Sequence, residues 1–327
     1  MVKTSLMISL IALLLTVFIA GMLIGPASIS PLDAAGALFG YGDRLINLIL
    51  LEVRLPRVIL ALLIGAALGL SGAALQGLLH NPLSEPALLG SGPTAAFGAV
   101  LAFYFGATEV HTLALPISAV VGALGATIIV FMLAGRTGRS ATLILAGVAI
   151  SSLAGSLTAL ALNLAPNPFA ASEIVFWMMG SLADRSFEHV WLSAPFIVIG
   201  GSLLLSVRGS LDALALGSET AQSLGVDMVS VNTRIVFGTA IAVGASTAVA
   251  GVIGFVGLAV PHILRPFVGH RPGSLLIASA LGGAVMLGLA DIVARILSVG
   301  SEIKLGVLTA IIGAPFFLAL ILKLRSN

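Results

Sequence analysis

"RLPRVILALLIGAALGLSGAALQGLLHNPLSEPALLG", at residues 54–90, is the stretch that decides the fold of this chain. Its apolar part, residues 58–79, has the roughly 20 residues that a helix needs to cross a membrane core about 30 Å thick. Gly65 and Gly69 are four residues apart, the spacing at which membrane helices pack closely. The two prolines that follow lack a backbone N–H and therefore end the helix. The stretch predicts a membrane-spanning helix followed by a sharp turn.

The composition extends this prediction to the whole chain. Of the 327 residues, 59% are hydrophobic and 9% are charged, and the mean hydropathy is +1.18. A soluble domain of this composition would have too little polar surface to face water. The net charge of +2 is too small to indicate nucleic-acid binding, and the absence of cysteine excludes disulfides, thiolate metal sites and cysteine nucleophiles. We therefore predict an all-α membrane protein that forms one transmembrane domain over residues 1–327.

Apolar runs divide the chain into about ten transmembrane helical elements, each judged by the length that a membrane crossing needs. An excess of basic residues in alternate loops predicts that both termini lie in the cytoplasm. This orientation also places the polar segment at residues 208–233 in the cytoplasm. The predicted elements lie near residues 6–25, 58–79, 88–105, 113–134, 141–162, 190–207, 235–256, 258–268, 274–297 and 304–324.

The polar segment contains "ALGSETAQSLGVD" at residues 215–227, between two apolar runs. Its pattern predicts a short helix lying across a membrane face. Ser218 can cap the helix, Glu219 falls in the first turn where the helix dipole favours an acid, and Gly225 follows as a C-terminal stop. Two interpretations remain open: a solvated loop that only joins two spans, or a docking helix for a cytoplasmic partner.

Several segments resemble one family, the FecCD or BtuC-like permease subunits of ATP-binding cassette (ABC) importers for ferric siderophores, haem and cobalamin. The resemblance covers nearly the whole chain. It rests on residues 54–90, on "LALGSETAQSLGV" at 214–226, on "GVIGFVGLAVPHILRPFVGHR" at 251–271, on "LADIVARIL" at 289–297 and on "LGVLTAIIGAPFFLALI" at 305–321.

The resemblance implies a type II importer permease with ten transmembrane helices in a bacterial inner membrane. Such a permease works as a pair, here expected to be a homodimer. It sits on two cytoplasmic ABC ATPase subunits, which hold ATP and Mg, and it receives substrate from a periplasmic binding protein. The chain itself is expected to bind lipid but no cofactor, metal or nucleic acid, and to catalyse no reaction. The expected substrate is an iron chelate, a ferric siderophore or haem, with cobalamin as the alternative.

The resemblance also implies two sets of functional residues on the cytoplasmic side. The first couples the permease to the ATPase, and the second forms a cytoplasmic gate at the turn after residue 79 and at the loop between the fourth and fifth long spans. For the turn, a simple helix stop is the alternative. The coupling residues are Ser218, Glu219, Gln222, Leu224, Gly225 and Val226, and the gate residues are Asn81, Leu83, Ser140 and Ala141.

Three arginines on the outer side oppose the charge trend. The resemblance implies that Arg54, Arg57 and Arg295 receive acidic residues of the binding protein, since complementary charge orients docking. The alternative is local ion pairing, with Glu52 or Asp291 as the partner.

The sequence indicates that the energy for transport comes from another subunit. None of its three lysines stands in the Gly-Lys-Ser/Thr pattern of a phosphate-binding loop. The long spans also lack a carboxylate near their centres, where an ion-coupled carrier retains one in spite of the cost. An ion-coupled secondary transporter is therefore the less favoured alternative, although sodium coordinated by backbone carbonyls would leave no such signal.

Overall fold

The computed structural model describes residues 4–27, 29–38, 43–111, 113–134, 140–165, 168–298 and 303–326, and these contain helices and no strand. The α-helices are α1 (Thr4–Leu23), α2 (Pro31–Leu38), α3 (Arg44–Leu48), α4 (Leu55–Leu79), α5 (Ser91–Tyr104), α6 (Ala107–Val110), α7 (Ala114–Ala134), α8 (Ser140–Asn163), α9 (Pro168–Met178), α10 (Phe187–Ser206), α11 (Arg208–Leu214), α12 (Ser218–Ser223), α13 (Met228–Ala250), α14 (Val256–Leu264), α15 (Pro272–Leu297) and α16 (Leu305–Ser326). A π-helical turn (Ile49–Arg54) joins α3 to α4, and 3₁₀ turns occupy Pro86–Leu89 and Arg265–Val268.

Within the described residues, each of the ten predicted elements coincides with a helix. Six helical segments are long and apolar enough to cross a membrane, and three shorter apolar ones accompany them. The prediction of an all-α membrane fold is therefore confirmed. One of the long segments runs without a break over residues 44–79, because the π-helical turn continues α3 into α4.

The start of α13 was predicted seven residues too late. The helix begins at Met228 because the Asp227 carboxylate caps it, accepting a hydrogen bond from the Val229 amide at 3.0 Å. It ends at Ala250, where Gly251 turns the chain with φ 73°. Residues 228–233 therefore belong to a span, and the polar segment proper consists of α11, α12 and their connections.

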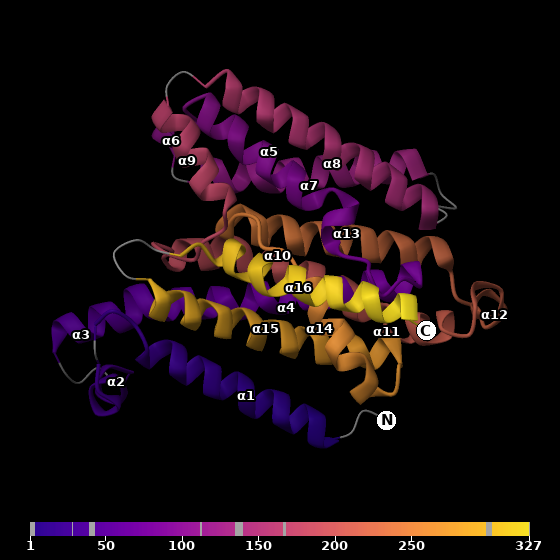
Figure 1. Cartoon of the computed structure of the whole chain (residues 1–327), viewed down its shortest axis with the longest axis horizontal. Coiled ribbons are helices and arrows are strands. Elements are labelled where there is room, and N and C mark those ends of the chain that lie inside the picture. Colours follow the sequence, from indigo (N-terminus) through magenta and orange to yellow (C-terminus); the bar gives the residue numbers. More distant parts are fainter. Residues whose placement is uncertain are drawn as a thin grey trace.

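Helix α4 lies at the centre of the bundle and packs against α15, α13, α14 and α10 (Figure 1). Its glycines allow the close approach. A Cβ atom at Gly65 would collide with the backbone of Gly283, and one at Gly69 with the carbonyl of Ser279, both on α15. Gly72 meets the carbonyl of Gly257 on α14 in the same way. The predicted packing face on this helix is confirmed.

The glycines at residues 251, 254 and 257 have the spacing of a helix face but do not form one. Residues 251–255 cross between α13 and α14 without helical structure, and α14 begins only at Val256. Phe255 precedes it with φ 67°, a backbone conformation that a bulky residue rarely adopts. Helix α14 is thus a half helix that starts inside the bundle.

The elements gather at two ends of the bundle (Figure 1). The start of α1, the end of α16 and the polar helix α12 lie at one end, which we call the α12 end. Helices α2, α3, α6 and α9 lie at the opposite end. The structure therefore places both described chain ends on the same side as the polar segment.

Candidate functional site

The polar helix α12 is short and sharply delimited. Gly217, with φ 104°, is its N-cap, so the prediction that Ser218 caps the helix is wrong; Ser218 is its first residue. Glu219 lies in the first turn, as predicted. Gly225 ends the helix with φ 87°, because its amide and that of Val226 bond back to the carbonyls of Gln222 and Ala221 at 2.9 and 3.0 Å.

This helix presents a mixed polar and apolar surface to the outside. Ser218, Glu219, Gln222 and Gly225 are exposed. Two leucines beside them, Leu216 and Leu224, are 66% and 64% exposed. Ala221 alone within α12 is buried, and Val226 packs partly against the same core. Exposed leucines grouped around polar side chains are typical of a surface that another protein covers.

The polar segment is tied to the transmembrane helices at two points. His80, the left-handed residue that ends α4, places its Nε2 atom 3.0 Å from the carbonyl oxygen of Leu214 in α11. The Asp212 carboxylate accepts a hydrogen bond from the Gly273 amide, in the first turn of α15, at 2.8 Å. Leu211 and Leu214 are buried in the main core. The polar segment is therefore joined to α4 and α15 through α11.

The predicted gate residues divide between two places in the chain. After α4, the Asn81 side-chain oxygen accepts a hydrogen bond from the Leu83 amide at 2.9 Å and so shapes the turn. Ser140 begins α8, but its side chain and that of Ala141 lie outside the described residues. Helix α8 packs against the 3₁₀ turn that follows Asn81 and Leu83. The contact lies at Gly147 and Ser151 in the middle of α8, away from its start at Ser140, so the gate stays a prediction.

Two polar side chains near this turn were not singled out from the sequence. Gln76, buried in α4, accepts a hydrogen bond from Arg265 at 2.6 Å. Glu85 accepts one from the Phe255 amide, also at 2.6 Å, and so holds the start of the half helix α14. Gln76 could have been singled out from the sequence, because a glutamine inside an apolar run needs a polar partner. The contact between Glu85 and Phe255 could not have been predicted from the sequence.

The first of the three outer arginines is buried against the end of α1. Arg54 is 4% exposed, and its guanidinium donates hydrogen bonds to the carbonyls of Met22 and Leu23 at 2.7 and 2.8 Å and to that of Ala27. A guanidinium satisfies several carbonyl groups at once, which a helix end leaves without partners. Arg54 therefore closes the C-terminal end of α1.

Arg57 and Arg295 share one buried carboxylate. Asp291, 1% exposed, lies 2.8 Å from Arg57 and 2.9 Å from Arg295. Arg295 also donates hydrogen bonds to the carbonyls of Gly21 and Ile24 on α1. The local pairing with Asp291 that the sequence left open is present, and all three arginines point into the chain in this conformation. Their docking role stays a prediction.

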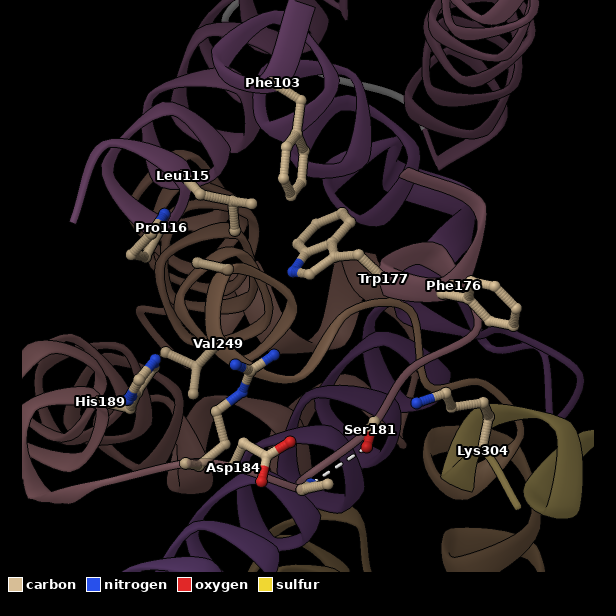
Figure 2. A pocket seen from close by; sticks show the side chains of 13 residues that line it. Phe103, Leu115, Pro116, Phe176, Trp177, Ser181, Asp184, His189, Val249 and Lys304 are labelled. Atoms are coloured by element: carbon tan, nitrogen blue, oxygen red, sulfur yellow. Dashed lines mark hydrogen bonds between the residues drawn. The ribbon is translucent and has the colours of Figure 1, made fainter. Parts of the chain in front are cut away.

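A pocket opens at the end of the bundle opposite α12, and Figure 2 shows it from close by. Its volume is about 520 Å³. It lies between the ends of α5, α9 and α13 and the starts of α7, α10 and α16. Phe103, Leu115, Pro116, Phe176, Trp177, Ser181, Ala183, Asp184, Arg185, His189, Ala248, Val249 and Lys304 line it.

Glycines bring three segments together beside this pocket. Gly180 and Gly251 both have φ 73°, and a Cβ atom at Gly251 would collide with the carbonyl of Trp177. The Ser181 amide donates to the carbonyl of Ala250 at 2.8 Å, and the Gly306 amide to that of Gly180 at 3.3 Å. These bonds hold the end of α9 against α13 and the start of α16.

The loop before α10 positions the polar lining. The Ser181 hydroxyl accepts a hydrogen bond from the Ala183 amide at 3.0 Å, drawn as a dashed line in Figure 2. Asp184 then turns the chain with φ 55°. The Ser186 amide donates to Nδ1 of His189 at 3.3 Å. In the neutral ring this leaves the proton on Nε2, so His189 can donate from that atom.

The membrane fold, with its half helix and its polar helix between two spans, is that of the permease subunit of an ABC importer. The chain belongs to the FecCD transport family, whose model matches residues 13–323. It is 37% identical to the vitamin B12 import system permease protein BtuC of Citrobacter koseri, over 97% of this chain and 94% of that one. It is equally identical to the Fe(3+)-citrate import system permease protein YfmD of Bacillus subtilis, over 99% and 97%.

Solved structures agree with this family. An inward-facing structure of a transporter described as metal-chelate ABC type matches with a TM-score of 0.88 and 34% identity, over 98% of this chain and 100% of that one. PsaBC from Streptococcus pneumoniae matches with a TM-score of 0.54 and 18% identity, over 87% and 94%, which shows the fold alone. The expected family and fold are confirmed.

Proposed function

We propose that this permease forms the path for an iron chelate across a bacterial inner membrane and catalyses no reaction itself. Its relatives include a ferric citrate permease and a vitamin B12 permease, so cobalamin is the second candidate substrate. The polar lining of the pocket favours a chelate that carries charge. Two such permeases, expected to be identical, pair in the membrane.

The observation that carries this proposal is the α12 surface. Glu219 and Gln222 stand beside the exposed Leu216 and Leu224, while Leu214 just before them is held by His80 at the end of α4. A partner that binds this surface can therefore move α4, and the turn after α4 carries Asn81 and Leu83. We propose that an ATPase with bound ATP and Mg docks here and that its closure acts on this gate.

The opposite end of the bundle is the proposed docking face for a periplasmic binding protein. Because Arg54 is buried, and Arg57 and Arg295 are mostly covered and paired with Asp291, their docking role would require the end of α1 to move. Docking that depends on these charges would weaken as salt is raised.

Reversing the charge of Glu219 tests the proposed ATPase surface. We expect Glu219→Lys to lose a co-purifying ATPase when the tagged permease is isolated in mild detergent, because a lysine in the first helical turn opposes the helix dipole and changes the surface charge. Mass spectrometry identifies the partner. Glu52→Lys is the matched control, since Glu52 is also exposed but lies at the other end of the bundle.

Two outcomes would count against the proposal. If both variants keep the ATPase, α12 is not its docking surface. If the wild-type permease carries no ATPase and vesicles accumulate substrate from an ion gradient alone, the protein is a secondary carrier. Uptake of ferric citrate or cobalamin, with the matching binding protein outside, by vesicles that contain the permease, its ATPase and ATP separates the two candidate substrates.

A further inference from the structure

The pocket opposite α12 is rich in hydrogen-bond donors. Its lining contains two cationic side chains, Arg185 and Lys304, against one carboxylate, Asp184, which is exposed. Figure 2 shows the indole nitrogen of Trp177 facing the interior of the pocket and the Lys304 amine reaching in from the start of α16. The buried Trp177 Nε1 atom has no acceptor in this structure.

The surroundings add both a helix N-terminus and a second carboxylate. Helix α10 begins at Phe187, directly after the loop that carries Arg185, and the exposed Glu188 stands in its first turn. The first N–H groups of a helix and its dipole both favour an anion at this position. His189 holds Nδ1 toward Ser186, so Nε2 is its donor atom. The donors of Arg185, His189, Trp177 and Lys304 outnumber the exposed carboxylates of Asp184 and Glu188, so the pocket suits a ligand that accepts hydrogen bonds.

We propose that this pocket binds a carboxylate-bearing ferric chelate at the entrance of the transport path. The inference rests on the proposed function and names the substrate class. Carboxylates match the geometry of a guanidinium, which can hold both oxygens at once. The volume of about 520 Å³ falls within the range of small-molecule sites, roughly 300–1,000 Å³. The aromatic rings of Phe103 and Trp177 provide the apolar walls that such sites use.

Tryptophan fluorescence gives a direct test, because the chain has two tryptophans in different surroundings. Trp177 lines the pocket, whereas Trp191 is 72% exposed on α10. The permease with its ATPase, in lipid nanodiscs and carrying Trp191→Phe, is titrated with ferric citrate without any binding protein. We expect saturable quenching of Trp177. The variant that keeps only Trp191 gives the unspecific background.

Charge-removing variants then test the donors. We expect Arg185→Gln and Lys304→Gln each to weaken ferric citrate binding about tenfold or more, since each loses a charge-assisted hydrogen bond. Arg44→Gln is the control, because Arg44 is exposed at the same end of the bundle and lies outside the pocket. Cobalamin and a neutral ferric trihydroxamate should bind weakly, and the two pocket variants should not change their binding.

Several results would overturn the proposal. Quenching that does not saturate, or equal affinity for the neutral trihydroxamate, would show that the pocket does not select carboxylates. If the two variants keep citrate binding but lose a binding protein in a pull-down, the pocket receives an acidic side chain of that protein instead. If ATP-driven uptake is unchanged in the two variants, the proposed role of the pocket is wrong but the proposed function stands. If the wild-type permease shows no ATP-driven uptake, the proposed function itself is wrong.

Discussion

Asp291 is a single carboxylate that holds two cations inside the protein. It is 1% exposed and pairs with Arg57 on α4 and with Arg295 on its own helix. Arg295 and Arg54 in turn bind carbonyls at the end of α1. These interactions therefore connect α1, α4 and α15. The Asp291 carboxylate is the counter-ion of both Arg57 and Arg295.

We expect Asp291→Asn to be strongly destabilising, by about 3–5 kcal/mol, because it leaves two mostly covered guanidinium groups without a counter-ion. Thermal unfolding in detergent measures the effect as a lower midpoint. Glu52→Gln is the control, since Glu52 is exposed near the same junction. Removing both charges, with Asp291→Asn and Arg295→Met together, should recover part of the loss. An Asp291→Asn protein that melts like the wild type would contradict this account.

At the scale of elements, the half helix α14 depends on a side chain from another segment. Glu85, in the loop between α4 and the 3₁₀ turn, accepts a hydrogen bond from the Phe255 amide at 2.6 Å. Phe255 has φ 67°, so the turn that starts α14 is strained. Burial raises the pKa of Glu85, and the bond from Phe255 opposes this by lowering it.

Two variants separate the bond from the charge. We expect Glu85→Gln to keep the bond through its side-chain oxygen, whereas Glu85→Ala leaves the Phe255 amide unpaired and costs about 1–3 kcal/mol. Unfolding midpoints in detergent, measured for both, give the comparison. Equal midpoints for the two variants would show that Glu85 does not hold α14.

The raised pKa of Glu85 also predicts a pH dependence. An acid with a raised pKa binds its proton more tightly in the folded than in the unfolded state, so protonation favours folding. This contribution is complete below the ordinary glutamate pKa and is lost as the pH rises through the folded value. Glu85→Gln should therefore lack that part of the pH dependence, and an unchanged profile would contradict it.

At the scale of the whole molecule, the two ends of the bundle should face opposite sides of the membrane. Both described chain ends lie with α12, and α2 lies at the other end (Figure 1). The sequence contains no cysteine, so single cysteines can report the side directly. Leu216, 66% exposed before α12, and Leu32, 86% exposed on α2, are suitable positions.

We expect a membrane-impermeant maleimide to label Leu32→Cys in spheroplasts and Leu216→Cys only in inside-out vesicles, because the excess of basic residues keeps the α12 end in the cytoplasm. The permease is expressed without its ATPase so that Leu216 stays accessible. The cysteine-free wild type provides the background. The opposite labelling pattern would show that the α12 end faces the periplasm. The proposed ATPase surface would then lie on the wrong side of the membrane.

Part of the candidate site could be predicted from the sequence. The polar helix could be located because Glu219 and Gly225 mark its start and stop locally, although the cap at Gly217 was missed because a glycine there leaves no side-chain signal. The three outer arginines were singled out from the sequence, but their inward orientation was not predicted. A sequence pattern does not determine which way a charged side chain points. The place of Trp177 in the pocket was not predicted, because no local pattern connects this residue with the rest of the lining.

The sequence by itself determined that this is a helical membrane protein, where its long spans lie and which glycines let helices approach, because hydropathy and spacing are properties of neighbouring residues. Only the tertiary structure decided which distant residues meet. Arg57 and Asp291 are 234 positions apart and Glu85 and Phe255 are 170 apart, and packing alone brings each pair into contact. The pocket arises in the same way, since its lining comes from six helix ends that no local pattern connects.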